Sequence, residues 1–356
     1  MARQYGSINL GQGFPGWCPP DFVIKASVAA SEGTFEVHQY AAPQGMPRLV
    51  QALCKLYSPL IERELQPSNV HISIGASGAL WLISQALLEP GDHALVISPY
   101  FDIYEGDIVS RGAKIVEVPL NMPPGVKSTA EYKLDMKALR EAVTKKEAKL
   151  FFLNTPHNPT GKMFSKEELQ EIAEIVKLND RLIVITDEVY EFITFDNVKF
   201  ERFCTLPGMW DRTINISSGG KFFSTTGWKV GWIYGPEELV KPSRTVANFV
   251  SFSVSHHHQY ATALALEHIM KEDLKYINEL KDHYNVLRQF MYETLEEIGL
   301  HPVKPQGTFF IDCDISGIEL EKDQGTQKSI TNQNFDKKDW NFCRWLTTEI
   351  GTFVDG

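Results

Sequence analysis

The sequence predicts an α/β protein with a large domain, whose mostly parallel, mixed sheet is covered by helices on both faces, and a smaller α+β domain. Apolar runs rich in β-branched residues alternate with helical stretches from about residue 71 to residue 217. Several of these runs are apolar throughout, which is typical of strands buried on both faces. At 356 residues the chain also exceeds the usual size of one domain.

The expected elements of the large domain follow in a regular order. Strands are predicted at "HISI" (71–74), "ALVIS" (94–98), "AKIVEV" (113–118), "KLFFLN" (149–154), "RLIVITD" (181–187) and "TINIS" (213–217). Helices are predicted at "GALWLISQALL" (78–88), "FDIYEGDIVSRG" (101–112) and "SKEELQEIAEIVKLND" (165–180). The last of these begins with a capping box, because Ser165 is followed three residues later by Glu168.

The rhythm changes after about residue 240, where longer helical stretches cover 256–270 and 282–299. A strand-like segment, "GTFFIDCDI" (307–315), then begins a second lobe. The predicted division is an N-terminal arm over 1–27, a large domain over 28–270 and a small domain over 271–356, with the arm joining the small domain. The polar stretch 321–339 is expected to be an exposed loop.

Composition excludes several classes of partner. With 35 basic against 45 acidic residues the formal net charge is −10, and no basic run is dense enough to follow nucleic acid. No window approaches the length of a membrane span. The five cysteines are scattered and are expected to be free thiols in a reducing compartment. We therefore expect a soluble cytoplasmic protein, with a mitochondrial form as the alternative.

Three motifs suggest functions that the surrounding residues do not support. "GQGFPG" (11–16) matches the dinucleotide fingerprint, but Pro15 and the prolines after it prevent the helix that the fingerprint requires. "LIVITDE" (182–188) resembles an ATPase strand, but no phosphate-binding loop accompanies it. Three adjacent histidines at 256–258 cannot converge on one ion from a helix face, so no metal is expected.

Polar residues follow three of the predicted strands where those strands end. They are Asn158, Asp187, Tyr190, Ser218 and Lys221. Because open α/β sheets bind ligands at the carboxyl ends of their strands, these side chains are expected to share one crevice. Taken singly they are also explained as a turn residue, a helix cap, a core aromatic and solvated loop residues. The lysine stands among glycines and serines, which indicates that a bound molecule approaches the backbone there.

Together, and in this order, the motifs resemble the pyridoxal-phosphate-dependent class I/II aminotransferases, and most of all the kynurenine aminotransferases. The resemblance is carried by "INLGQGFP", "QYAAPQG", "NTPHNPTGK", "TDEVYE", "LPGMWDRTINISS" and "GGKFFSTTGWKVGW". It extends from about residue 8 to about residue 350. It implies the type I fold of these transferases, and transfer of the amino group of kynurenine, aromatic, glutamine or sulfur amino acids to a 2-oxo acid.

The resemblance implies catalytic roles for three residues and pyridoxal 5'-phosphate (PLP) as the cofactor. Lys221 is expected to be the Schiff-base lysine and the base that moves the substrate's α-proton. Asp187 would pair with the pyridine nitrogen and keep the ring an electron sink. Asn158 and Tyr190 would hydrogen-bond the phenolic oxygen of the ring, and Phe101 would stack on its face.

The resemblance also assigns the phosphate and the substrate. Phosphate ligands are expected from the start of a helix and from nearby loops, namely Ala76, Ser77, Ser218 and Lys229. Tyr40 would reach the phosphate of a partner subunit, which implies a homodimer with composite active sites. Substrate contacts are expected from Gly13, Asn158 and Tyr104.

Family members continue beyond the point where this chain stops, and their C-terminal part carries an arginine that binds the substrate α-carboxylate. No residue here matches that arginine, and Arg344 is not expected to replace it. The small domain is accordingly expected to be incomplete. Two further readings are therefore a poorly active paralogue that binds PLP or pairs with a full-length subunit, and a β-lyase acting on cysteine conjugates.

Overall fold

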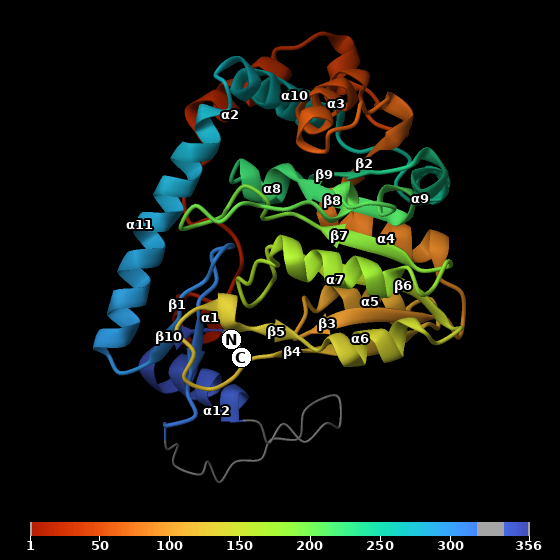
Figure 1. Cartoon of the computed structure of the whole chain (residues 1–356). Helices are drawn as coiled ribbons and strands as arrows, with labels where there is room; N and C mark the ends of the chain where they lie inside the picture. The colour runs from red at the N-terminus through yellow and green to blue at the C-terminus, as the bar shows by residue number, and fades with distance from the viewer. Residues whose placement is uncertain (1, 319–337, 355–356) are drawn as a thin grey trace.

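The computed structural model describes residues 2–318 and 338–354. Its centre is an eight-stranded sheet in the order β2-β9-β8-β7-β6-β3-β4-β5 (Figure 1). The strands are β2 (Val70–Ile74), β3 (His93–Ser98), β4 (Lys114–Asn121), β5 (Lys133–Leu134), β6 (Ala148–Asn154), β7 (Ile183–Asp187), β8 (Thr213–Ser218) and β9 (Val230–Tyr234). The strands from β8 to β4 are parallel to their neighbours within that group, whereas β9 and β5 run antiparallel to the strands beside them. The predicted mostly parallel, mixed sheet is confirmed.

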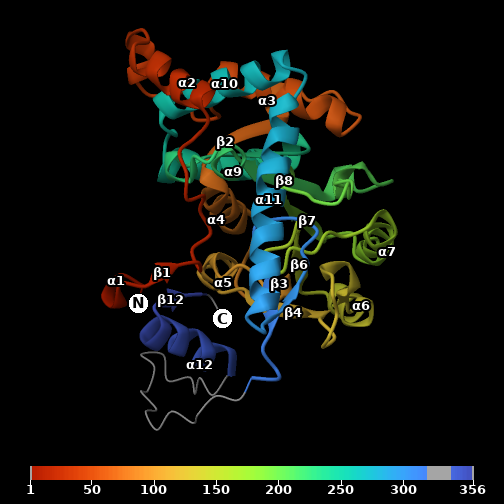
Figure 2. The same ribbon diagram turned by 90° about the vertical axis from the view of Figure 1, so that its left-hand side faces the viewer.

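Helices cover both faces of the sheet, as predicted. Figure 2 shows α4 (Gly75–Leu87) and α5 (Ile103–Val109) on one side of the strands, and α6 (Met136–Val143) and α7 (Lys166–Val176) on the other. The two-residue period of a strand divides the core accordingly. In β3, Leu95 and Ile97 pack with α6 and α7, and Ala94 and Val96 pack with α4 and α5. Both layers exclude water, so each strand can be apolar throughout.

The capping box predicted for α7 is present. The Glu168 backbone N–H donates to Ser165 Oγ over 3.2 Å, and the Ser165 N–H donates to the Glu168 carboxylate over 2.9 Å. The same carboxylate forms an ion pair with buried Lys162 at 3.1 Å. Glu168 thus completes the N-terminal cap of α7 and also neutralises the buried ammonium of Lys162 beside the loop that follows β6.

The helices at the top of Figure 1 are α2 (Asp21–Ser31), α3 (Pro47–Leu60) and α10 (His256–Lys271). A left-handed Leu274 (φ 59°) separates α10 from the long α11 (Lys275–Glu297), which runs down the side of the molecule. Both helices predicted after residue 240 are therefore confirmed. A further helix, α9 (Glu237–Val250), packs on α4.

Segments from the two ends of the chain lie together at the lower edge of the molecule (Figures 1 and 2). There β1 (Ile8–Asn9) pairs in parallel with β12 (Thr352–Phe353), close to α1 (Ala2–Tyr5), α12 (Lys338–Trp345) and the π-helical turn η7 (Leu346–Ile350). This contact agrees with a second lobe built from both chain ends. The division at residues 27 and 270 stays a prediction.

The strand expected over 307–315 is short. Only β11 (Asp312–Asp314) is a strand, paired antiparallel with β10 (His301–Val303). Thr308 has a positive φ of 67°, and Gly307 lies so close to Pro156 that a Cβ there would be 2.7 Å from that ring. The chain therefore bends at 307–308 before it can enter the strand. The loop predicted over 321–339 lies outside the described residues, except that Lys338 and Asp339 begin α12.

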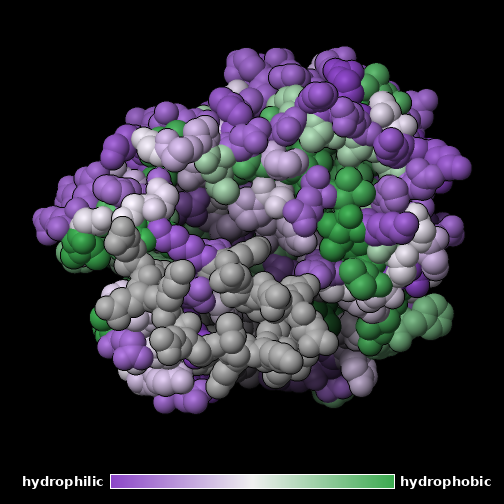
Figure 3. All heavy atoms as spheres, turned by 90° about the horizontal axis from the view of Figure 1, so that it is seen from below, coloured by the Kyte–Doolittle hydropathy of each residue, from purple (hydrophilic) through white to green (hydrophobic). Residues whose placement is uncertain are grey.

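Among the described residues, no helix is both long enough and apolar enough to cross a membrane. Figure 3 shows the molecule from below, where hydrophilic side chains occupy most of the upper margin and hydrophobic ones gather in a band on the right. No group of three or more potential metal ligands occurs in the described part of the chain.

A buried ionic cluster is formed by residues that follow β7, the strand that ends in Asp187. Arg202 donates through Nη1 to Glu188 and through Nη2 to Glu191, and all three side chains are at most 6% exposed. The Tyr234 hydroxyl donates to Glu188 over 2.9 Å, and the Tyr57 hydroxyl donates to Glu191. One guanidinium thus serves two buried carboxylates. Burial raises the pKa of Glu188 to about 7, while the positive charge of Arg202 opposes that rise.

We expect Arg202→Met to lower the free energy of unfolding by about 3–5 kcal/mol, because it leaves two buried carboxylates without their cation. Urea denaturation followed by circular dichroism measures this loss. The matched control is Lys199→Met, whose side chain is 80% exposed in its ion pair with Glu201 and should change stability by less than about 0.5 kcal/mol. Equal losses in the two variants would contradict the argument.

Candidate active site

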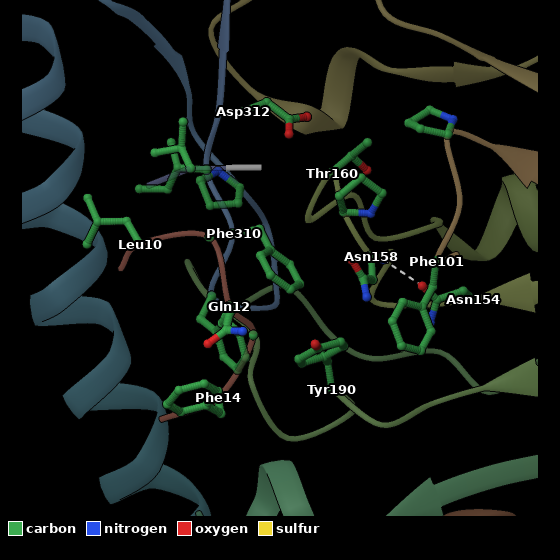
Figure 4. A pocket seen from close by; sticks show the side chains of 18 of the residues that line it. Leu10, Gln12, Phe14, Phe101, Asn154, Asn158, Thr160, Tyr190, Phe310 and Asp312 are labelled. Atoms are coloured by element: carbon green, nitrogen blue, oxygen red, sulfur yellow. Dashed lines mark hydrogen bonds between the residues drawn. The ribbon is translucent and has the colours of Figure 1, made fainter. Parts of the chain in front are cut away.

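A cavity of about 1430 Å³ opens at the carboxyl ends of β6, β7 and β8, where the sequence predicted a crevice. Figure 4 shows Phe101, Asn158 and Tyr190 facing it from different segments. Ten of the twelve predicted site residues line the cavity: Gly13, Ala76, Ser77, Phe101, Asn158, Asp187, Tyr190, Ser218, Lys221 and Lys229. The fold therefore brings together residues that are up to 216 positions apart (Gly13 to Lys229).

Lys221 lies in α8 (Gly219–Phe222), a single turn that begins directly after β8. Its Nζ donates to the backbone oxygen of Gly13 and lies 5.1 Å from the centre of the Phe309 ring. Gly220 has little room for a side chain, because a Cβ there would be 3.1 Å from Thr226 Cα. Burial lowers the pKa of Lys221 to about 8, although the negative charge of Asp187 opposes this shift. About one tenth of the amine is therefore unprotonated at pH 7, far more than for a lysine with its ordinary pKa.

Asp187 ends β7 and is 4% exposed. Burial raises the pKa of this carboxyl to about 6, while the Tyr104 hydroxyl, which donates to Oδ2 over 2.8 Å, and the charge of Lys221 lower it. A buried carboxylate with so few partners is stabilised by a cation placed against it. The site therefore favours a bound group that carries a positive charge or a strong N–H donor.

Asn154 was missed by the sequence analysis as a site residue. Its Nδ2 donates to the backbone oxygen of Asp187 over 2.8 Å, and its Oδ1 accepts from the backbone N–H of Asn158 (Figure 4). One amide thereby connects the ends of β6 and β7 and positions the Asn158 loop. Its only signal in the sequence was a polar residue closing the apolar run "KLFFLN".

An anion-binding arrangement occupies the start of α4, a helix of 13 residues. Lys229, in the left-handed region at φ 54°, donates through Nζ to Ser77 Oγ over 2.8 Å. The backbone N–H of Gly75 donates to the Lys229 carbonyl over 2.8 Å. A Cβ on Gly231 would lie 2.3 Å from the Gly75 carbonyl carbon, so only glycine allows this approach. Ammonium, hydroxyl and helix N–H groups converge as a phosphate requires.

Two predicted residues lie elsewhere. Tyr104 was expected to contact substrate, but it is 2% exposed and does not line the cavity. Its hydroxyl is bonded to Asp187, which makes it a positioning residue for that carboxylate. Tyr40 is 81% exposed on another part of the surface, where its ring meets Phe252 edge-on at 5.3 Å.

Among the described residues that line the cavity, the Lys and Arg side chains are Lys221, Lys229 and Arg288. Arg288 forms a bidentate pair with Asp196 at 2.7 and 2.8 Å and donates to the Pro305 carbonyl. Both terminal nitrogens of this guanidinium are thus already hydrogen-bonded within the protein, to Asp196 and Pro305. Arg344 belongs to α12 and is not part of the wall, in keeping with the expectation that it does not replace the family's arginine.

These features define a transaminase, and residues 6–342 match the family of class I and II aminotransferases. The chain belongs to that family, whose members depend on PLP. It is 43% identical to a kynurenine–oxoglutarate transaminase of Dictyostelium discoideum in an alignment 362 positions long, which covers 99% of this chain and 82% of the relative. Human kynurenine–oxoglutarate transaminase 3 is 38% identical, over 98% of this chain and 76% of the relative.

Solved structures agree with the sequence relatives. Bna3p of Saccharomyces cerevisiae, described as a proposed kynurenine aminotransferase, superposes with a TM-score of 0.91 at 33% identity, covering 99% of this chain and 83% of that one. An N-succinyldiaminopimelate aminotransferase of Mycobacterium tuberculosis superposes with a TM-score of 0.86 at 34% identity, covering 99% and 84%. The predicted type I fold and the transaminase activity are thus confirmed. The same fold accommodates different substrates.

The lowered pKa of Lys221 predicts how this amine reacts. In the apoprotein, labelling of Lys221 by an amine-specific reagent should rise through a midpoint near pH 8, because only the unprotonated amine reacts. Asp187→Asn should move the midpoint to lower pH, since the carboxylate charge raises the pKa of the amine. Mass spectrometry of labelled peptides measures both curves, with exposed Lys146 correcting for the reagent's own pH dependence. An unchanged midpoint in the Asn variant would sink the argument.

Proposed function

We propose that this chain is a PLP-dependent transaminase of the kynurenine–oxoglutarate type, which transfers the amino group of kynurenine, aromatic, glutamine or sulfur amino acids to a 2-oxo acid. The observation that carries this proposal is the Lys221 amine and the Asp187 carboxylate facing one cavity beside the anion-binding start of α4. The names of the relatives at 38% and 43% identity support the choice of substrate.

The residues present fit PLP. Lys229, Ser77, Ser218 and the N–H groups at the start of α4 would hold its phosphate. The Asp187 carboxylate would accept a hydrogen bond from the pyridinium nitrogen, a cationic donor in direct contact, whereas its present hydrogen-bond donors are the neutral Tyr104 hydroxyl and Val189 N–H.

The face and the phenolic edge of the ring also have candidate partners. Phe101 would pack on the ring face, and Asn158 and Tyr190 would hydrogen-bond the phenolic oxygen. PLP, when bound, supplies a reactive aldehyde carbon and a ring that withdraws electrons from the substrate α-carbon.

The reaction also needs groups that this chain itself provides. Lys221 Nζ, with its pKa near 8, can act as a nucleophile and then accept and return a proton at the substrate α-carbon. Tyr104 and Asn154 hold the Asp187 side chain and backbone in place, so the negative charge does not have to reorient during the reaction. The Gly13 loop lies across from Lys221 and borders the space left for substrate.

The aromatic side chains that line the cavity support the choice of aromatic amino acids as amino donors. These side chains include Phe14, Trp17, Tyr190, Tyr284, Phe309 and Phe310. Phe309 stacks on Tyr284 with ring centres 5.8 Å apart and meets Tyr190 edge-on at 5.3 Å. The flat apolar side chain of an aromatic amino acid would leave water on packing against these rings, which favours its binding.

We expect Lys221→Ala to lower kcat by at least about 10²- to 10⁴-fold, since it removes both the nucleophile and the proton carrier. Transamination of kynurenine with 2-oxoglutarate, together with borohydride reduction and peptide mapping, measures the rate and the attachment site. The matched control is Lys166→Ala, which removes an exposed lysine at the start of α7. Full activity of the Lys221 variant, or a pyridoxyl group on another lysine, would rule out the assignment.

The proposal includes a homodimer in the cytoplasm. Tyr40, Phe249, Val250 and Phe252 form an exposed apolar patch, with exposed fractions from 51% to 88%. An apolar surface of this kind is typical of a subunit interface. It supports a dimer in which Tyr40 reaches the partner's phosphate site.

All five cysteines are free thiols, which supports a reducing compartment such as the cytoplasm.

Phe249→Glu is expected to weaken the dimer by at least about 10-fold in Kd, because the symmetric interface would acquire two buried charges. Sedimentation velocity over a range of protein concentrations measures the shift. The control is Leu178→Glu, a 49% exposed position two residues after α7 ends, which should leave the dimer intact. A wild-type protein that stays monomeric at all concentrations would refute the interface.

A further inference from the structure

The cavity contains a second acidic position that the proposed chemistry does not use. Asp312, the first residue of β11, lines the wall together with Phe310, and Figure 4 shows Phe310 opposite Asn158 and Asp312 farther along, with its carboxylate on the side of Thr160. The hydroxyl of buried Tyr132 donates to Asp312 Oδ2 over 3.3 Å. Burial of the carboxyl raises its pKa to about 6, so it is mostly ionised at neutral pH.

Structural needs do not explain this carboxylate. A carboxylate offers about four acceptor positions, and Tyr132 occupies one of them through a long hydrogen bond. None of the ion pairs within residues 2–318 and 338–354 includes Asp312. Asp312 is partly exposed at the cavity wall, but it is shielded from water enough to raise its pKa, so an ionised carboxyl without a cation is unfavourable there. The acceptor positions of Asp312 that no described residue fills therefore point to a ligand with a hydrogen-bond donor.

The position of Asp312 relative to the reactive amine defines the kind of ligand. The Phe309 ring centre lies 5.1 Å from Lys221 Nζ. Asp312 follows Phe309 by three residues, so the Cα atoms of Phe309 and Asp312 are at most about 11 Å apart. A Cβ on Gly13 would be 3.4 Å from the Phe310 ring, which places this ring at the boundary of the substrate space. An amino donor held at Lys221 can thus lay an aromatic side chain along Phe310, with its far edge directed at Asp312.

We propose that Asp312 is a specificity residue that accepts a hydrogen bond from an amino group on the aromatic side chain of the amino donor. Kynurenine, a 2-aminophenyl ketone, has such a group, whereas phenylalanine does not. The inference rests on the proposed function and deepens it, because it says which part of the substrate this chain recognises. The other described acidic residue of β11, Asp314, differs from it, because Asp314 accepts from the Ser316 N–H and is oriented by that turn.

The first arm of the test compares two substrates that differ by one aromatic amino group, L-kynurenine and β-benzoyl-L-alanine. In the wild-type holoenzyme, kcat/KM for kynurenine should exceed that for benzoylalanine by about 10- to 100-fold, mostly through KM. In Asp312→Leu the ratio should fall to about 1, and in Asp312→Asn, which keeps an acceptor of the same shape, it should be intermediate. Tyr132→Phe should keep the preference, because the carboxylate remains. The matched control Asp314→Asn should also keep it.

The second arm measures binding without turnover. The ligands are 4-(2-aminophenyl)-4-oxobutanoate and 4-phenyl-4-oxobutanoate, which have no α-amino group and cannot be transaminated. Calorimetry with the holoenzyme should show a similar preference for the aminophenyl compound, and Asp312→Leu should remove it. If neither amino acid is turned over but this preference and its loss are seen, the proposed function fails and the Asp312 subsite stands.

The inference is overturned by any of three results. The wild type could fail to distinguish the members of both ligand pairs. Asp312→Leu could retain the preference, or it could weaken both members of a pair equally, as a purely structural residue would. Since Asp312→Asn preserves shape and Tyr132→Phe preserves charge, a Leu variant that does not fold would still leave two variants to decide the outcome.

Discussion

The opposition of the Asp187 carboxylate and the Lys221 amine in one buried cavity is the interaction around which the site is arranged. Burial acts on these two groups in opposite senses, because it disfavours the charged form of each. It raises the pKa of the acid to about 6 and lowers that of the amine to about 8, so the two values approach each other. Each group also favours the charged state of the other. The cavity therefore combines a nucleophilic amine with a fixed negative charge near neutral pH.

Close backbone packing maintains that electrostatic arrangement. The start of α4 can approach β9 only because Gly231 has no side chain, and Lys229 turns its ammonium back toward Ser77 from a left-handed backbone position. On the neighbouring strands, Asn154 connects the backbone of Asp187 to the loop at Asn158. Because several of these contacts involve backbone atoms or the buried Asn154 side chain, the backbone that presents the donors is already in place before any ligand binds, which reduces the reorganisation that catalysis would otherwise require.

Two arginines near the site are neutralised by carboxylates within the protein. Arg202 compensates Glu188 and Glu191 below the strand end, and Arg288 is held by Asp196 at the cavity wall. Asp312 differs from these groups, since its described partner is a neutral hydroxyl. The cavity thus has a reactive end, where Asp187 and Lys221 lie, and a distal end, where Asp312 adds a second acidic group. Substrate recognition is expected to vary at the distal end, because relatives with this fold act on different compounds.

The sequence by itself determined the alternation of strands and helices, the N-cap of α7 at Ser165, and the grouping of Asp187, Ser218 and Lys221 at one crevice. It could do so because side chains that follow parallel strands meet at one edge of a sheet, so Asp187, Ser218 and Lys221 were recognisable from their place after apolar runs. The capping box and the apolar strands are local patterns as well, and they need no knowledge of distant contacts.

Only the tertiary structure decided the strand order, with β9 antiparallel between β2 and β8, and the roles of Asn154, Tyr104 and Asp312. Each of these roles depends on a contact between residues that are 33 to 180 positions apart. Local periodicity contains no information on such contacts. Tyr104 in particular sits in an ordinary helical pattern, and only the packing of α5 against the sheet turns its hydroxyl toward Asp187 rather than into the cavity.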